Sequence, residues 1–211
     1  MTASSVATRL RSPRRPLLRA LMQPGNVLPA LVWLFLAVNQ ARLSPFPPAP
    51  ATLGLVLINS VALVLFMVRR DATRVGGKLE LVIALAGTFI VSFLKGPEAR
   101  DAGAVASAVQ LAALAGWAAS LITLGRSFGI VPADRGLVQH GPYRFVRHPI
   151  YAFEALFFAG YLIAVPTWYS GLIIAIWCAL QVTRIVREER ILDGYAGYKS
   201  LVRWRVLPGV W

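Results

Sequence analysis

Hydrophobic residues dominate this chain in six long runs that are separated by short polar connections. The runs cover residues 27–41, 52–68, 79–94, 104–124, 150–166 and 168–183. A helix that crosses a membrane upright needs about 20 apolar residues, and several of these runs are shorter. The pattern therefore predicts an all-α, polytopic membrane bundle of five to six helices, some of them tilted or in a thin region of the bilayer.

Two features of the runs predict how the helices pack. The break at Pro166-Thr167-Trp168 is very short, so the last two runs should form an antiparallel helical hairpin. The fourth run is rich in alanine, glycine and serine between Ala102 and Ser120. Small residues let helices approach closely in lipid, so this run should be a buried helix of the bundle.

Composition and charge agree with a membrane protein. The chain is 57% hydrophobic and 15% charged, whereas soluble domains carry roughly 25% charged residues. With the N-terminus inside and six crossings, only Arg42, Lys95 and Arg100 of the 22 basic residues fall outside. This asymmetry follows the positive-inside rule and predicts cytoplasmic N- and C-termini, in five or six spans alike. The basic residues behind the net charge of +13 should then contact anionic lipid at the cytoplasmic face, and no nucleic acid is expected as a partner.

The N-terminal segment allows two interpretations. Ser12-Pro13-Arg14-Arg15 before an apolar run loosely resembles a twin-arginine export signal. The favoured interpretation is a basic cytoplasmic arm, because further spans follow instead of a soluble domain. We expect an arm over residues 1–26, a four-helix transmembrane region over 27–124 and a catalytic region over 125–211. The alanine- and arginine-rich composition suggests the inner membrane of a bacterium.

A first polar cluster lies where the fifth run begins. It contains Tyr143, Arg144, Arg147, His148 and Tyr151. Such a cluster at the mouth of a membrane helix is costly unless it binds something. Pro149 suits the first helical turn and should leave free N–H groups near His148 and Ile150 for a carboxylate or phosphate. The alternative is a basic loop that faces water and lipid headgroups.

A second polar cluster follows the last run. Arg184 and Glu188 are four residues apart, so they share one face if the last helix continues past the bilayer. On their own they are better explained as a surface ion pair at a helix end, which contributes little to stability. Both clusters lie on the predicted cytoplasmic side and could therefore close over one pocket.

An ordered set of motifs joins the two clusters. The motifs are Gly141-Pro142-Tyr143, Arg147-His148-Pro149-x-Tyr151, Glu188-Glu189-x-x-Leu192, Tyr195-x-x-Tyr198 and Arg205-x-x-Pro208-Gly209. This set resembles the carboxy-terminal half of the isoprenylcysteine carboxyl methyltransferases over residues 124–211. The phospholipid methyltransferases and related bacterial membrane methyltransferases are similar in the same region.

The resemblance implies a membrane enzyme that transfers a methyl group from S-adenosyl-L-methionine, bound in a cytoplasmic pocket, to a lipophilic acceptor. The cofactor-binding residues would be Arg135, Gly136, Leu137, Val138, Tyr143, Arg147, His148, Pro149, Ile150, Tyr151 and Glu188. Arg184 would face the acceptor and, with Glu188, serve in catalysis. Chemically, Arg147 or His148 can hold the methionine carboxylate, and Glu188 can accept from the amino group or a ribose hydroxyl.

The acceptor stays open at this point. Asp193-Gly194-Tyr195 replaces the Phe-Gly-Glu-x-Tyr stretch usual in the isoprenylcysteine enzymes, and the basic element at 202–205 also differs. A prenylated carboxylate, a phospholipid amine and a small thiol all remain candidates. Glu154 lies one turn into the fifth run and could be an interfacial hydrogen-bonded residue or point to the site.

Three other functional classes remain as alternatives. A lipid-binding or scaffold protein would explain the basic loops, and a transporter would use Glu154 as its buried acid. A haem carrier would have only His140 and His148 as axial ligands, both in one loop. No metal is expected.

Overall fold

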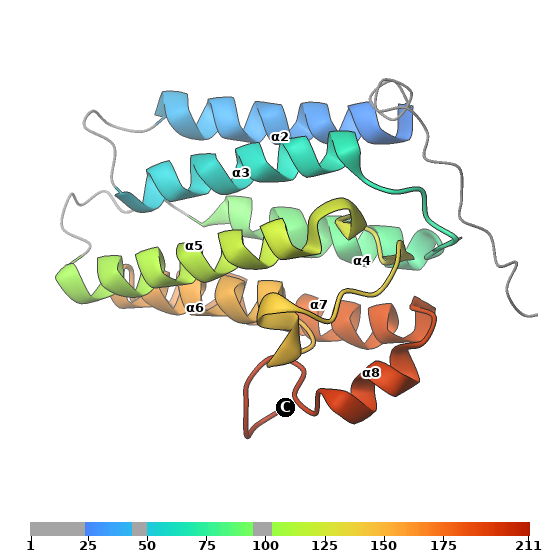
Figure 1. Cartoon of the computed structure of the whole chain (residues 1–211). Coiled ribbons are helices and arrows are strands. Elements are labelled where there is room, and N and C mark those ends of the chain that lie inside the picture. The colour runs from blue at the N-terminus through green and yellow to red at the C-terminus, as the bar shows by residue number, and fades with distance from the viewer. Residues whose placement is uncertain (1–23, 44–49, 95–102) are drawn as a thin grey trace, which may run out of the picture.

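The structure is a computed structural model that describes residues 24–43, 50–94 and 103–211. Within these residues, six long helices run up and down beside one another (Figure 1). They are α2 (Pro24–Leu43), α3 (Pro50–Val68), α4 (Lys78–Phe89), α5 (Ala104–Leu124), α6 (Pro149–Ala164) and α7 (Trp168–Ile191), followed by the short α8 (Tyr195–Leu201). Each predicted run is a helix, which confirms the all-α class. The predicted N-terminal arm lies almost entirely outside the described residues.

Some helices of the bundle are long enough to cross a membrane. The helices at Pro50–Val68, Ala104–Ser127 and Trp168–Ile191 are long and apolar enough to cross a bilayer, and α6 is a shorter apolar helix. The chain is therefore a polytopic helical membrane protein, while five to six spans stays a prediction. Helix α7 continues well past 183, where its apolar run ends, and so carries the second polar cluster beyond the apolar part.

Two sets of helices enclose the interior. Helix α2 packs on α3, α3 on α5 and α5 on α6, whereas α4 packs mainly on α7. Small residues make the α5–α6 contact close, as predicted. Ala106, Ala113 and Ser120 of α5 are fully buried, and a methyl group on Gly160 of α6 would come within 3.2 Å of the Ala106 carbonyl oxygen.

Helices α6 and α7 form the predicted antiparallel hairpin, but they are splayed apart. Thr167 caps α7, since its hydroxyl oxygen accepts the Ser170 N–H at 3.1 Å. Further along, the rings of Phe158 and Trp177 meet edge to face at 4.8 Å between centroids. Beyond this contact the facing side chains border a cavity, so the two helices touch little along their length.

One end of the bundle gathers most of the non-helical chain, and we call it the site end. Here α3, α5 and α7 finish and α4 and α6 begin, with α8 and the C-terminal tail folded beside them (Figure 1). A two-stranded antiparallel ribbon, β1 (Arg74–Val75) with β2 (Ala133–Asp134), joins the α3–α4 and α5–α6 connections. The pattern of apolar and polar residues does not predict this ribbon. Both predicted polar clusters lie at the site end.

Candidate functional site

A cavity of about 1300 Å³ begins at the site end and continues between the helices. Ligand sites are typically about 300–1,000 Å³, so this cavity has room for more than one ligand. Of the residues predicted to bind cofactor or acceptor, those that line it are Arg135, Gly136, Leu137, Val138, Tyr143, Arg147, His148, Ile150, Tyr151, Arg184 and Glu188. Pro149 does not line it and is instead buried as the first residue of α6.

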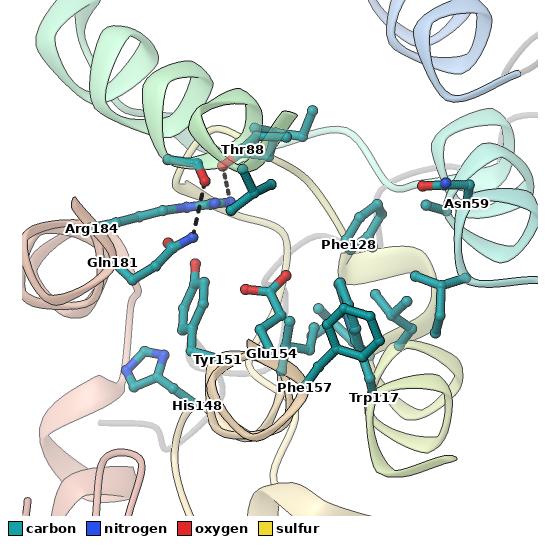
Figure 2. Close-up of a pocket in the computed structure, with 18 of the residues that line it drawn as sticks. Asn59, Thr88, Trp117, Phe128, His148, Tyr151, Glu154, Phe157, Gln181 and Arg184 are labelled. Carbon is teal, nitrogen blue, oxygen red and sulfur yellow. Dashed lines mark hydrogen bonds between the residues drawn. The ribbon is translucent and has the colours of Figure 1, made fainter. Parts of the chain in front are cut away.

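Arg184 and Glu188 each bind a different group instead of each other. The Tyr151 hydroxyl donates to Glu188 Oε2 at 3.0 Å. Arg184 donates from Nη2 to the carbonyl oxygen of Ile130, and its guanidinium lies 5.3 Å from the centre of the Tyr151 ring. Among the described side chains no ion pair joins Arg184 to Glu188, so the surface-pair alternative does not describe them. Both residues line the cavity together with Tyr151. Figure 2 shows Arg184 and Tyr151 close to each other there.

Glu189 connects four segments at the back of the site. Its Oε1 accepts from the Tyr195 hydroxyl at 2.7 Å and from Arg205 Nε at 2.9 Å, and its Oε2 accepts from Arg205 Nη2 at 3.0 Å. His148 Nε2 and Arg147 Nη2 lie 3.3 and 3.5 Å from Oε1. Burial and the bond to Glu189 raise the pKa of Tyr195, so its hydroxyl keeps its proton. Glu189 thus ties α7 to α8, the tail and the start of α6.

The start of α6 differs from the sequence prediction. The N–H of Arg147 donates to the Trp204 carbonyl at 2.9 Å, and the N–H of His148 donates to the Arg205 carbonyl at 2.8 Å. The expectation that the N–H group at His148 is free for an anion is therefore wrong. The tail folds back from about sixty residues further along the chain, a contact that no local pattern shows.

Tyr143 forms a buried wall of the cavity near the end of α5. Its hydroxyl lies 3.4 Å from the Ser120 carbonyl oxygen, and its own carbonyl accepts from the Tyr198 hydroxyl at 2.5 Å. Burial raises the pKa of Tyr143 well above its usual 10, so the ring presents a neutral face. The contact with Tyr198 locks α8 onto the 141–144 turn.

Three arginines of the cavity wall carry unpartnered donors. In the described part of the chain, Arg135 Nε, Arg147 Nε and Nη1, and Arg184 Nε are buried without a hydrogen-bond partner. Burial, and secondarily the nearby Arg69, lower the pKa of Arg135 to about 10, which still leaves it charged at neutral pH. A buried donor without a partner costs about 1–3 kcal/mol. Arg135 and Arg147 therefore suit a ligand that brings an anionic group.

Sequence reasoning missed several residues of the site. Asp134 is buried, and its carboxylate accepts the N–H groups of Gly136 at 3.1 Å and Asp193 at 3.3 Å, which holds the 135–138 stretch in place. Gln181 of α7 donates to the Gly87 carbonyl at 3.4 Å and lines the cavity. An amide one turn before Arg184 in an otherwise apolar run was the available signal for Gln181.

Residues 102–195 match the family model of the phospholipid methyltransferases. The match begins beside α5, ends at Tyr195 and includes the whole cavity wall from Arg135 to Glu188. It confirms the resemblance to membrane methyltransferases of the phospholipid and isoprenylcysteine type. No curated protein and no solved structure matches the chain.

The alternative classes gain no support from the site. His140 is exposed and His148 is tied to Glu189, so these two side chains do not face a shared haem site. Among the described residues, no group of three or more histidine, cysteine, aspartate or glutamate side chains could hold a metal ion. The family match spans both polar clusters.

Proposed function

We propose that this protein is an integral membrane methyltransferase that uses S-adenosyl-L-methionine and acts on a lipophilic acceptor at the cytoplasmic face. The observation that carries the proposal is one cavity with two unlike parts. At the site end it presents unpartnered arginine donors and Glu188, and between the helices its lining is mainly apolar. The first part suits a charged cofactor and the second part suits a lipid.

The cofactor side of the cavity has complementary groups for the amino-acid part of the donor. Arg147 and Arg135 would hold the carboxylate, because their free N–H groups are buried and aimed at no protein acceptor. Glu188 would accept from the amino group or a ribose hydroxyl. S-adenosyl-L-methionine supplies the reactive methyl group; the residues keep donor and acceptor in line and exclude water.

The acceptor side lies deeper in the bundle. Leu55 and Ile58 of α3, Phe157 and Phe158 of α6, and Trp177 of α7 line it. Burial of apolar chains on such a wall contributes about 25 cal/mol per Å². The resemblance at residues 141–209 favours a prenylated carboxylate as acceptor, whereas the family match favours a phospholipid amine.

Binding of the demethylated cofactor to the purified protein in detergent tests the proposal. Arg135→Gln should weaken S-adenosylhomocysteine by at least about tenfold, which corresponds to about 1.4 kcal/mol. Arg144→Gln is the matched control, because Arg144 is exposed on the same connection and does not line the cavity. Calorimetry that shows no binding to the native protein, or equal affinity for both variants, would contradict the proposal.

Substitutions of Arg184 and of Glu188 should impair different properties, turnover in one case and cofactor affinity in the other. Arg184→Lys keeps the charge but loses the planar fork, so turnover should fall sharply while cofactor affinity stays within about threefold. Glu188→Gln should weaken the cofactor itself, because it removes a charged acceptor from a partly dry site. Arg190→Lys, exposed on the same helix, should change neither quantity. Equal losses of the same quantity in both site variants would refute this division of roles.

A further inference from the structure

Residues 204–211 form a closed turn, which we call the tail turn. The N–H groups of Arg205 and Val206 both donate to the carbonyl oxygen of Trp211, at 2.8 and 3.0 Å. The N–H group of Trp211 donates in return to the carbonyl oxygen of Leu207 at 3.2 Å. These bonds give the turn a defined shape, so they also fix where its side chains lie.

The tail turn lies at the depth where α6 begins. Its first two carbonyl groups accept the N–H groups of Arg147 and His148, and Pro149 follows directly as the first residue of α6. Figure 1 shows the tail outside the helix bundle, beside this end of α6. Helix α6 is apolar, so its first turn marks the level at which the apolar layer of the membrane begins. The tail turn therefore lies at the level of the lipid headgroups.

The tail turn presents apolar side chains that the described chain leaves largely uncovered. Leu207 and Val210 are 53% and 76% exposed, and the Val210 N–H donates to the Leu207 carbonyl at 3.1 Å. Phe145, two residues before Arg147, is 64% exposed. Apolar side chains that are exposed together outside the membrane helices mark a contact with a partner or with a membrane surface.

Basic and aromatic side chains surround these apolar residues. The guanidinium groups of Arg203 and Arg205 lie 4.7 and 5.0 Å from the centres of tryptophan rings. The guanidinium of Arg144 lies 4.9 Å from the centre of the Phe145 ring. No acidic residue occurs in the sequence from 194 to 211. Tryptophan is enriched at the level of lipid headgroups, and arginine near a membrane surface is attracted by anionic lipid.

From this depth, exposure and charge we propose that the tail turn and Phe145 form an interfacial anchor that inserts into an anionic lipid surface. The partner is the bilayer that contains the chain itself. Lipid phosphates would pair with the arginines, and the upper acyl chains would cover Leu207 and Val210. Arg205 also binds both carboxylate oxygens of Glu189, so one side chain joins the anchor to the site. The anchor would thereby fix the height of the site end above the apolar layer.

Fluorescence quenching of the full chain in bilayer discs tests the anchor. An environment-sensitive label is attached at Val210→Cys in a Cys178→Ser background. The discs contain phosphatidylcholine and anionic phosphatidylglycerol, with a lipid that carries a doxyl quencher near the top of its acyl chain. Interfacial anchors bury apolar groups about 5–10 Å deep, so quenching should be at least about threefold stronger than for a label at Arg190→Cys. Arg190 is the matched position, because it is exposed on α7 beyond the apolar run.

Variants of the anchor separate its apolar part from its charge. Leu207→Asp places a charge beside the label, so quenching at Val210→Cys should fall to the level of the Arg190→Cys label. Arg203→Gln should weaken quenching in the anionic discs more than in discs of phosphatidylcholine alone. Arg74→Gln removes the same charge at an exposed position of β1 and should leave the quenching unchanged.

Three results would overturn the proposal. The first is quenching by the doxyl lipid that is no stronger at Val210→Cys than at Arg190→Cys. The second is a Val210→Cys label that is shielded from acrylamide in water but not reached by the doxyl lipid, which would assign the turn to a protein partner or a second copy. The third is equal quenching in neutral and anionic discs that Arg203→Gln does not change, which would exclude anionic lipid as the partner.

Discussion

Replacing Glu189 by glutamine should be the most destabilising single-charge change at the site end. Glu189 is 10% exposed in its side chain, and it neutralises Arg147, which is 3% exposed, together with Arg205 and His148. Removing one partner of a buried ion pair leaves charge without compensation and costs about 3–5 kcal/mol. Arg205 is 24% exposed and can regain water, so we expect the lower limit, about 3 kcal/mol.

Glu80→Gln is the matched comparison for this prediction. Glu80 makes one ion pair with Arg187 at 2.6 Å, and the two side chains are 17% and 34% exposed. A partly exposed pair of this kind is screened by water, so it stabilises the fold much less than the buried network around Glu189. Both variants remove one carboxylate charge that pairs with arginine, so the difference between them reports burial and the number of partners.

Thermal unfolding in detergent, followed by tryptophan fluorescence, measures both variants. For a chain of this size 1 kcal/mol shifts Tm by about 2–4 °C, so Glu189→Gln should lower Tm by about 6–12 °C, and Glu80→Gln should lower it by a clearly smaller amount. Adding Arg205→Gln to Glu189→Gln should cost much less than its effect alone, because the two residues share one network. Similar small shifts in both single variants would refute the assignment of Glu189 as the connecting residue.

Two further predictions concern packing and topology. Gly160→Ala should destabilise the protein by about 1–3 kcal/mol, because the new methyl group meets the α5 backbone. Gly171→Ala should be neutral or slightly stabilising, because a methyl group at Gly171 has nothing within 4 Å. Thermal unfolding of both variants checks this prediction. For topology, single cysteines are placed at the exposed positions His140, Lys199 and Trp168 in a cysteine-free background. The cysteines at 140 and 199 should react with an impermeant reagent from one side of the membrane, and the cysteine at 168 should react from the other side. Labelling of all three from one side would contradict the alternating topology.

The sequence predicted the helices because their signals are local. Each apolar run became a helix, Pro149 occupies the first turn of α6 as expected, and the small residues of α5 form its close contact with α6. Backbone hydrogen bonds in a helix join residues four apart, so periodicity and proline positions carry this information. The motifs from Gly141 to Glu188 also predicted most of one cavity wall, because their order along the chain resembles a known family.

The partners of the polar side chains depended on the tertiary structure. Glu188 and Glu189 are adjacent in sequence, yet Glu188 faces the cavity with Tyr151 while Glu189 binds Arg205 and His148 behind it. No sequence pattern separates their roles, because successive residues of a helix point about 100° apart and the identity of each neighbour is set by other segments.

Long-range packing also decided which groups stayed without partners. The tail carbonyls occupy the N–H groups of Arg147 and His148, so the His148 N–H is not free for the anion that the sequence predicted there. The splay of α6 from α7 leaves Glu154 and Gln181 with unpaired oxygens in a cavity, where a tighter hairpin would have covered them. The sequence alone determined the class of protein and many of the residues that meet at the site end. Only the folded chain decided which donors and acceptors remain free, because hydrogen bonding is satisfied or left open by segments far apart in sequence.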